Sequence, residues 1–94
     1  MADPVTALSD NVLDLTVTRL GAAVNNAVVT VTIYGPSGGI TLVATNVPFV
    51  SNGLYELNTG PVVWPTDGNY RSVWDVTDSN GRKKHKEESV VCVR

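Results

Sequence analysis

The chain has 94 residues, enough for a single domain with one modest core, and its formal net charge is −2. This charge balance excludes bulk electrostatic binding to nucleic acid, and the single cysteine, Cys92, excludes an intrachain disulfide. The N-terminal segment lacks the basic and apolar regions of a signal peptide, and no apolar run is long enough to span a bilayer. Because the chain begins with Met1, we expect a complete small reading frame.

Residues 11–34 predict two half-buried strands joined by a turn. In "NVLDLTVTRL" the apolar residues alternate with polar ones at Leu13, Leu15 and Val17. In "NAVVTVTIYG" the apolar positions of one face are Ala27, Val29, Val31 and Ile33. Alternation with period two places one face of a strand on a core and the other in water, as in an antiparallel sheet. The intervening "GAAVNN" combines glycine with two asparagines and predicts a turn.

The middle of the chain predicts shorter and less regular strands. "GPSGG" at 35–39 indicates a turn, because Pro36 fixes φ and the glycines permit positive φ. Segment 40–50 contains Pro48, which suits an edge strand or a bulge. "SNG" at 51–53 is a hairpin signal before the short strand "LYELNT". In "GPVVWP" we expect Trp64 to cap the open end of a sandwich or, alternatively, to anchor an exposed interface.

"GNYRSVWDVTD" at 68–78 is the clearest strand of the chain. One of its faces carries Tyr70, Ser72, Trp74 and Val76. A second "SNG" at 79–81 predicts a turn, and the last strand would join the core near Val91 and Val93. The sequence therefore predicts an all-β protein, an antiparallel β-sandwich of about seven strands.

The run "RKKHKEE" after this turn is the most charged part of the chain. Its basic residues are Arg82, Lys83, Lys84 and Lys86. Alternation makes both faces of the run polar, so we expect the hairpin tip to project beyond the sandwich. Two interpretations are open: the tip binds an acidic protein surface, or its lysines protect an edge strand from aggregation. No aromatic residue interleaves to stack on bases, so nucleic acid is not the expected partner.

Residues 1–10 precede the first predicted strand. We predict an N-terminal arm at 1–10 and a sandwich domain at 11–94. The arm could be a frayed tail, or it could bind a neighbouring protein by adding to a sheet edge or lying in a groove. In the second interpretation, the contacts lie between Pro4 and Leu8 and include Val5.

The sequence offers little for catalysis. His85 has no serine or cysteine partner suggested by a motif, and no histidine or cysteine spacing indicates a metal. Asp75, Asp78 and Asn80 could suggest calcium, but they lack the form of a ligand loop, and a hairpin turn favours the same residue types. We expect a protein that is not an enzyme, with no cofactor and with Cys92 as a small apolar residue of the last strand.

Two segments carry a resemblance to known folds. "GAAVNNAVVTVTIYGPSG" resembles the early hairpin of immunoglobulin-like sandwiches and of regulatory-like domains of macroglobulins and carboxypeptidases, and "WPTDGNYRSVWDVTDSNGR" resembles their late hairpin. This resemblance implies an immunoglobulin-like arrangement, a tyrosine corner at Tyr70 and a core position for Trp74. The chain has no cysteine pair, so antibody-type domains are excluded.

In its length, its lack of disulfides and its late hairpin, the chain also resembles small virion proteins of tailed bacteriophages. That resemblance implies a capsid decoration or cementing protein that binds the major capsid protein or another virion protein. Its contacts would be Pro4, Val5, Leu8 and the basic tip, with a possible homo-oligomer on the particle and neither nucleic acid nor membrane as a partner. It implies a virion location, after synthesis in the host cytoplasm. The alternatives are a phage neck or tail component, a bacterial surface-adhesion module for carbohydrate or protein, and an enzyme subunit or inhibitor domain.

Overall fold

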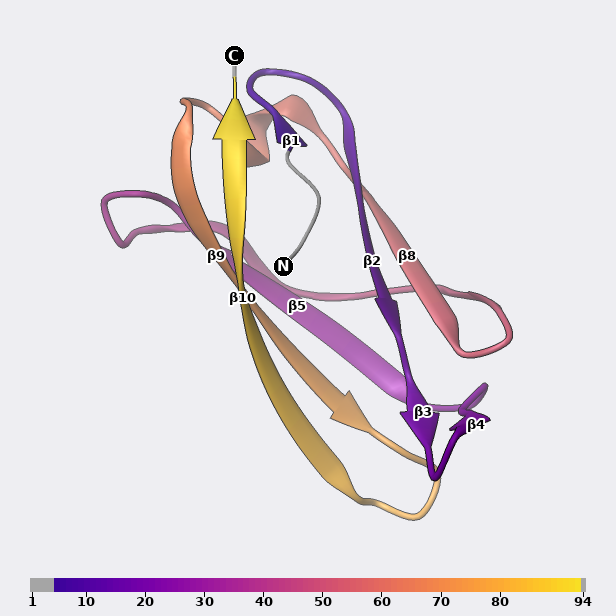
Figure 1. Cartoon of the computed structure of the whole chain (residues 1–94). Coiled ribbons are helices and arrows are strands. Elements are labelled where there is room, and N and C mark those ends of the chain that lie inside the picture. The colour runs from indigo at the N-terminus through magenta and orange to yellow at the C-terminus, as the bar shows by residue number, and fades with distance from the viewer. Residues whose placement is uncertain (1–4, 94) are drawn as a thin grey trace.

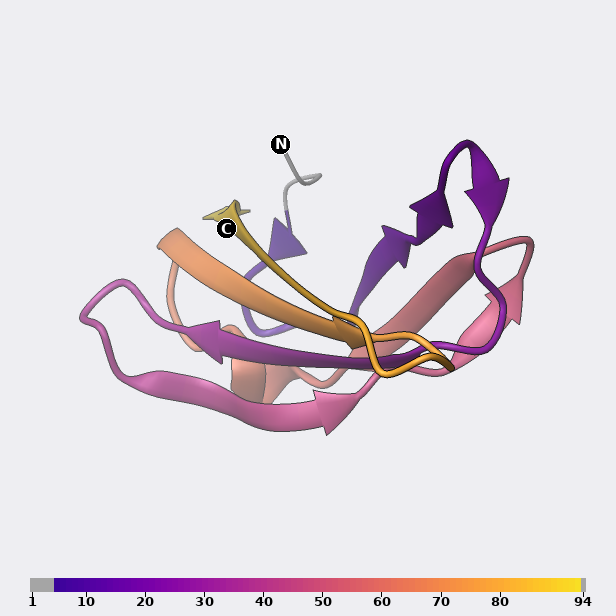
Figure 2. The same cartoon turned by 90° about the horizontal axis from the view of Figure 1, so that it is seen from below.

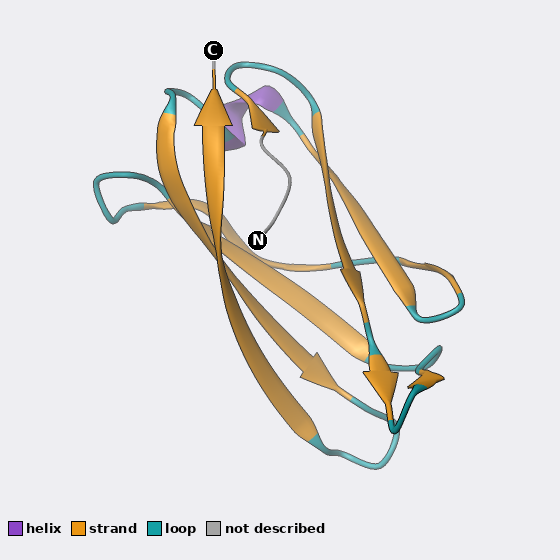
Figure 3. Ribbon diagram, viewed as in Figure 1, coloured by secondary structure: helices purple, strands orange, loops and turns teal. Residues whose placement is uncertain are grey.

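The computed structural model describes residues 5–93 as two facing β-sheets (Figure 1; Figure 3). The larger sheet has the strand order β1 (Val5–Thr6), β10 (Lys83–Val93), β9 (Gly68–Thr77), β5 (Val28–Tyr34) and β6 (Ile40–Asn46). The smaller sheet has the order β2 (Asn11–Thr16), β8 (Leu54–Thr59) and β7 (Phe49–Ser51). A short hairpin, β3 (Thr18–Arg19) with β4 (Ala22–Ala23), and one 3₁₀ turn, η1 (Pro61–Val63), complete the elements.

The chain passes repeatedly from one sheet to the other, which gives the immunoglobulin-like arrangement. It leaves the smaller sheet after β2, enters the larger sheet at β5, returns to the smaller sheet at β7 and crosses again after β8. Pro48 lies at one of these crossings, between the edge strands β6 and β7, where no ladder requires its missing N–H. The prediction of an all-β sandwich is confirmed. Among residues 5–93 the one parallel pair is β1 with β10, and all other strand pairs are antiparallel.

Strands β5 and β9 build the centre of the core as their alternation predicts. Val31 and Ile33 have no exposed surface, and Val29 is 2 % exposed. Trp74 is 2 % exposed on the neighbouring strand, directly opposite Val31. From the smaller sheet, Leu13 and Leu15 close the core across from them.

Tyr70 forms the predicted tyrosine corner. Its hydroxyl donates a hydrogen bond to the carbonyl of Thr66 (2.7 Å) and accepts one from the N–H of the same residue (3.3 Å). The ring packs edge-on against Trp64 with 5.0 Å between centroids. Trp64 is fully buried, and its Nε1–H donates to the hydroxyl of Thr59 at 2.7 Å. Trp64 therefore caps the sandwich end, and the alternative of an exposed anchor is wrong.

The last strand differs from expectation in two ways. Residues 82–87 are exposed, as the polar run predicts, but the predicted projection beyond the sandwich is wrong, because β10 pairs with β9 from Lys83 onward and β5 pairs with β9 as far as Thr77. The expected core positions are shifted by one residue: Val90 and Cys92 are buried, whereas Val91 and Val93 are 39 % and 46 % exposed. The register of β10 on β9 sets this parity, since it places Val90 opposite the buried Tyr70.

Candidate protein-binding surface

The structure places the described part of the predicted arm, residues 5–10, against the domain itself. Val5 pairs with Cys92 and is 4 % exposed, so as a partner contact it is a wrong prediction: its side chain belongs to the core. Leu8 is 67 % exposed, and its N–H donates to the carbonyl of Trp64 at 2.8 Å. Pro4 lies outside the described residues. Of this predicted contact set, only Leu8 lies on the described surface.

The basic residues of β10 are brought to one end of the sandwich. Arg82 closes the turn after β9, and Lys83 and Lys84 begin β10. The turn is held by Asp78, whose carboxylate accepts hydrogen bonds from the N–H groups of Asn80 and Arg82, both at 2.9 Å. The cations are therefore presented by a well-connected turn.

Two residues that the sequence does not predict as contacts, Arg19 and Leu20, lie beside these cations. The β3–β4 hairpin lies at the same end of the molecule, and Figure 2 views the sandwich from that end. Arg19 ends β3 and Leu20 begins the turn; Leu20 is 97 % exposed with a positive φ of 51°. A groove of about 390 Å³ runs between this hairpin and the start of β10, and Arg19, Leu20 and Arg82 line it with both lysines. We call the set Arg19, Leu20, Arg82, Lys83 and Lys84 the basic pole.

The cations of the basic pole share their groove with one carboxylate, that of Asp78, but form no ion pair within residues 5–93. The ion pairs in that range are Lys86 with Glu88 at 2.9 Å, Arg71 with Glu87 at 3.3 Å and His85 with Asp75 at 3.0 Å. None of them includes a cation of the basic pole. The pole thus combines four unpaired positive side chains with one fully exposed leucine, although the whole chain is acidic.

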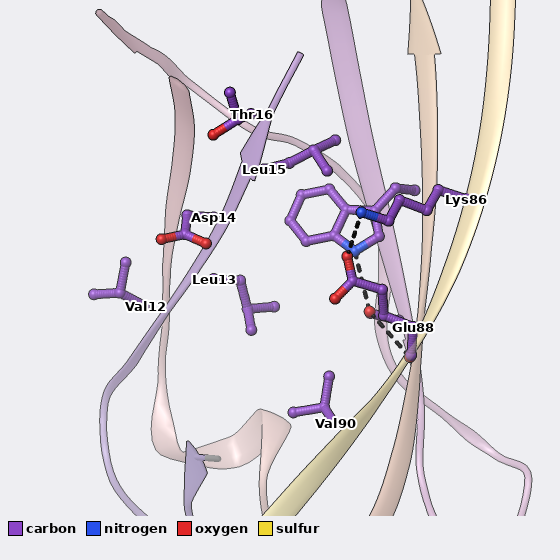
Figure 4. A pocket seen from close by; sticks show the side chains of 10 residues that line it. Val12, Leu13, Asp14, Leu15, Thr16, Lys86, Glu88 and Val90 are labelled. Carbon is purple, nitrogen blue, oxygen red and sulfur yellow. Dashed lines mark hydrogen bonds and ion pairs between the residues drawn. The ribbon is translucent and has the colours of Figure 1, made fainter. Parts of the chain in front are cut away.

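Lys86, the remaining basic residue of the predicted site, faces a different groove. With Glu88 it lines a groove of about 340 Å³ between β10 and β2 (Figure 4). Figure 4 shows Leu13 and Leu15 of β2 directed toward this space and the Lys86–Glu88 pair on its other side. The predicted site is thereby divided between the pole and this groove.

The carboxylates considered for calcium have other partners. Asp78 serves the turn, and Asp75 lies 3.0 Å from Nδ1 of His85 on an exposed face. Among residues 5–93 there is no group of three or more metal-ligating side chains. The described part of the chain likewise contains no helix of the length and apolarity needed to cross a membrane.

Cys92 is a buried thiol of the larger sheet. It is 2 % exposed, and burial, together with the negative charge of Asp67, raises the pKa of its thiol above the ordinary 9.0. A buried, protonated thiol is a weak nucleophile. Cys92 therefore packs as the small apolar residue that the sequence predicts.

Comparison with known proteins supports the fold and goes no further. No family model matches the chain, and no curated protein is similar to it in sequence. Among solved structures, a candidate glycoside hydrolase from Bacteroides vulgatus ATCC 8482 aligns with 98 % of this chain at a TM-score of 0.57 and 12 % identity. This chain spans only 17 % of that protein's length. The PmoD soluble domain from Methylocystis sp. ATCC 49242 (Rockwell) aligns with 96 % of this chain and 77 % of its own, at a TM-score of 0.59 and 10 % identity.

These observations define the protein as an all-β sandwich module with a basic pole at one end. At such low identity the two neighbours show the shared architecture alone, since one fold hosts many functions. The functional argument therefore rests on the surface of this chain.

Proposed function

We propose that this chain is a non-enzymatic structural protein that attaches to an acidic protein surface through its basic pole. The proposed setting is the head of a tailed bacteriophage, where the chain decorates the major capsid protein. The observation that supports this proposal most is the concentration of unpaired cations around the exposed Leu20 at one end of an acidic chain. Apolar contact supplies affinity, and the surrounding charges supply orientation and selectivity.

The groove at the pole has the character of a docking site for a protein. Leu20 stands at the tip of a two-stranded hairpin, and the cations come from both sides of the groove. An acidic loop of a shell protein could cover the leucine while its carboxylates meet Arg19 on one wall and Arg82 on the other. A lattice of such contacts would stabilise an assembled shell by mass action, because the protein binds the shell and not free subunits.

A carbohydrate-binding role receives less support from the aromatic residues. Trp64, the aromatic residue considered for such a site, is fully buried beneath the tyrosine corner, and Trp74 is 2 % exposed. Neither indole is available to stack on a sugar ring.

The proposal is tested first on particles from the source organism. Mass spectrometry would compare the copy number of this chain with that of the major shell protein. A copy number close to that of the shell protein supports decoration of the head, whereas a few copies per particle would move the protein to the neck or tail. Absence from particles would overturn the phage setting and leave the protein-binding role to be tested separately.

The basic pole is tested with purified shells and charge-neutral variants. Arg82→Ser should weaken binding to the shell and reduce the salt dependence of that binding, because one ionic contact with the acidic partner is lost at the pole. The matched control is Arg71→Ser, which removes the same charge from the outer face of the sheet, where it pairs with Glu87. Equal effects of both substitutions would contradict a role for the pole.

A further inference from the structure

We propose that the free edge of β10 is a homodimer interface, in which two copies pair their β10 strands antiparallel about a two-fold axis. The larger sheets of the two copies would then become one continuous sheet. This inference does not depend on the phage setting. The proposed interface shares Lys83 and Lys84 with the basic pole, and its other residues lie outside the pole. It rests on three features: main-chain groups with no partner strand among residues 5–93, an edge of unbroken register and a self-complementary pattern of charge.

The edge of β10 offers main-chain groups over most of its length. Among residues 5–93, the only strand beside this edge is β1, which pairs with Cys92 and Val93 alone. The N–H of Asp78 donates to the carbonyl of Arg82, so this pair is hydrogen-bonded within the β9–β10 ladder. Antiparallel ladders alternate between bonded and non-bonded pairs. The main-chain groups directed outward are therefore those of Lys83, His85, Glu87, Ser89 and Val91.

The opposite edge of the same sheet is less suitable for pairing. Strand β6 carries register shifts against β5 between Val31 and Ile33 and again before Tyr34, which mark bulges or irregularities. Bulges twist an edge away from a potential neighbour. Strand β10 pairs with β9 in an unbroken register from Lys83 to Cys92, so its edge is regular.

The order of charges along β10 makes an antiparallel pair attractive in one register. Basic residues occupy its first half, and Glu87 and Glu88 begin its second half. When Lys86 faces its own copy on the axis, Lys84 lies opposite Glu88 of the second copy, and His85 lies opposite its Glu87. Each of these contacts occurs twice by symmetry, and the Lys84–Glu88 contact is a cross-strand pair of opposite charge, which stabilises a sheet.

Neighbouring registers combine attractive and repulsive contacts. A shift of two in one direction brings Lys84 opposite Lys86 twice, while Lys83 lies opposite Glu87. A shift in the other direction brings Glu87 opposite itself, while Lys86 lies opposite Glu88. In the favoured register the like pair is Lys86 on the axis, and each of these ammonium groups is already held by Glu88 at 2.9 Å within its own chain. Like charges directly opposite one another are otherwise destabilising.

The position of β1 limits the interface to a length that fits this register. A partner strand that begins at Lys83 would start opposite Ser89, and its preceding turn would leave the edge before reaching β1 at Cys92. The paired segment would then run from Lys83 to Ser89 in both copies. Four bonded residue pairs over this segment would supply about eight main-chain hydrogen bonds.

The first test measures mass and uses a charge swap. Sedimentation equilibrium of the purified chain should give a species of about twice 10.0 kDa at high protein concentration. Lys84→Glu alone and Glu88→Lys alone should each weaken the dimer by about tenfold in Kd, because attraction becomes repulsion at two symmetric contacts. The double variant Lys84→Glu/Glu88→Lys should restore dimerisation. Circular dichroism melting would verify that each variant is folded.

The second test reads the register directly. In the favoured register residue 86 faces itself in a non-bonded pair, whose Cα separation of about 4.5 Å permits a disulfide. Lys86→Cys should therefore form a disulfide-linked dimer under mild oxidation. Lys84→Cys, on the same strand face, is the matched control and should not; an equal mixture of Lys84→Cys and Glu88→Cys should form the mixed dimer. A monomer at every concentration, or equal crosslinking of Lys86→Cys and Lys84→Cys, would overturn the proposal.

Discussion

A buried hydroxyl between the two sheets gives the sharpest test of the packing. The Nε1–H of Trp74 donates to the hydroxyl of Ser72 at 3.0 Å, and this hydroxyl donates to the carbonyl of Glu88 at 3.2 Å. Both side chains are nearly inaccessible, Ser72 at 1 % and Trp74 at 2 % exposure. Ser72→Ala would therefore leave the indole N–H buried without its partner.

The expected cost follows from the state of that N–H group. Leaving a buried donor unsatisfied costs about 1–3 kcal/mol, so Ser72→Ala should lower the free energy of unfolding by this amount. Trp74→Phe removes the donor and part of the ring, at a cost of about 2–3 kcal/mol, while Trp74→Ala should cost about 3–5 kcal/mol. The double variant Trp74→Phe/Ser72→Ala has no buried indole donor left. Its loss of unfolding free energy should therefore be smaller than the sum of the two single losses by about 1 kcal/mol.

Urea unfolding followed by far-ultraviolet circular dichroism would supply these free energies. Trp64 remains in every variant, so its fluorescence provides a second probe of the same transition. The reasoning is refuted if the two single costs add to within about 0.5 kcal/mol in the double variant, because additivity would mean that the two side chains are not coupled.

Three further predictions concern separate parts of the chain. Gly53→Ala should destabilise by more than about 1 kcal/mol, because φ is +77° and the new Cβ would lie 2.5 Å from a main-chain oxygen; Gly39→Ala, in open space, is the control in urea unfolding. Arg82→Ser should leave the melting temperature within about 2 °C while it flattens the salt dependence of shell binding, and a large loss of stability would indicate a structural role instead. For Cys92, the raised pKa of the folded thiol means that only the unfolded chain ionises as pH rises through 9, so stability is complete below that pH and falls above it. Cys92→Ala should reduce this alkaline loss in unfolding titrations, and an unchanged pH profile would contradict it.

Local patterns in the sequence predict much of the core. Alternation in β5 and β9 identifies Val29, Val31 and Trp74 as buried, because each strand packs one face on the other sheet. The "DGNY" turn and the resemblance to immunoglobulin-like sandwiches together predict the corner at Tyr70. These features depend on residues close together in the chain.

Features that depend on distant segments were missed. The parity of β10 is fixed by its register on β9, and a polar run gives no apolar signal to reveal it. Val5 looked like part of a free arm because its partner, Cys92, lies at the other end of the sequence. The basic pole was found in part: its run on β10 is visible in the sequence, but Arg19 and Leu20 join it only through the fold. The single local signal for them is Leu20 before a glycine, at the tip of a hairpin.

The pairing of β1 with β10 also has a consequence for synthesis. Residues leave the ribosome in chain order, so Val5 emerges long before Cys92, the residue beside which it is buried. The place for β1 at the sheet edge does not exist until the last strand has been made and released from the exit tunnel. Pairing of β1 therefore waits for β10, and a nascent chain that stalls before β10 would hold its first strand unpaired and open to chaperones.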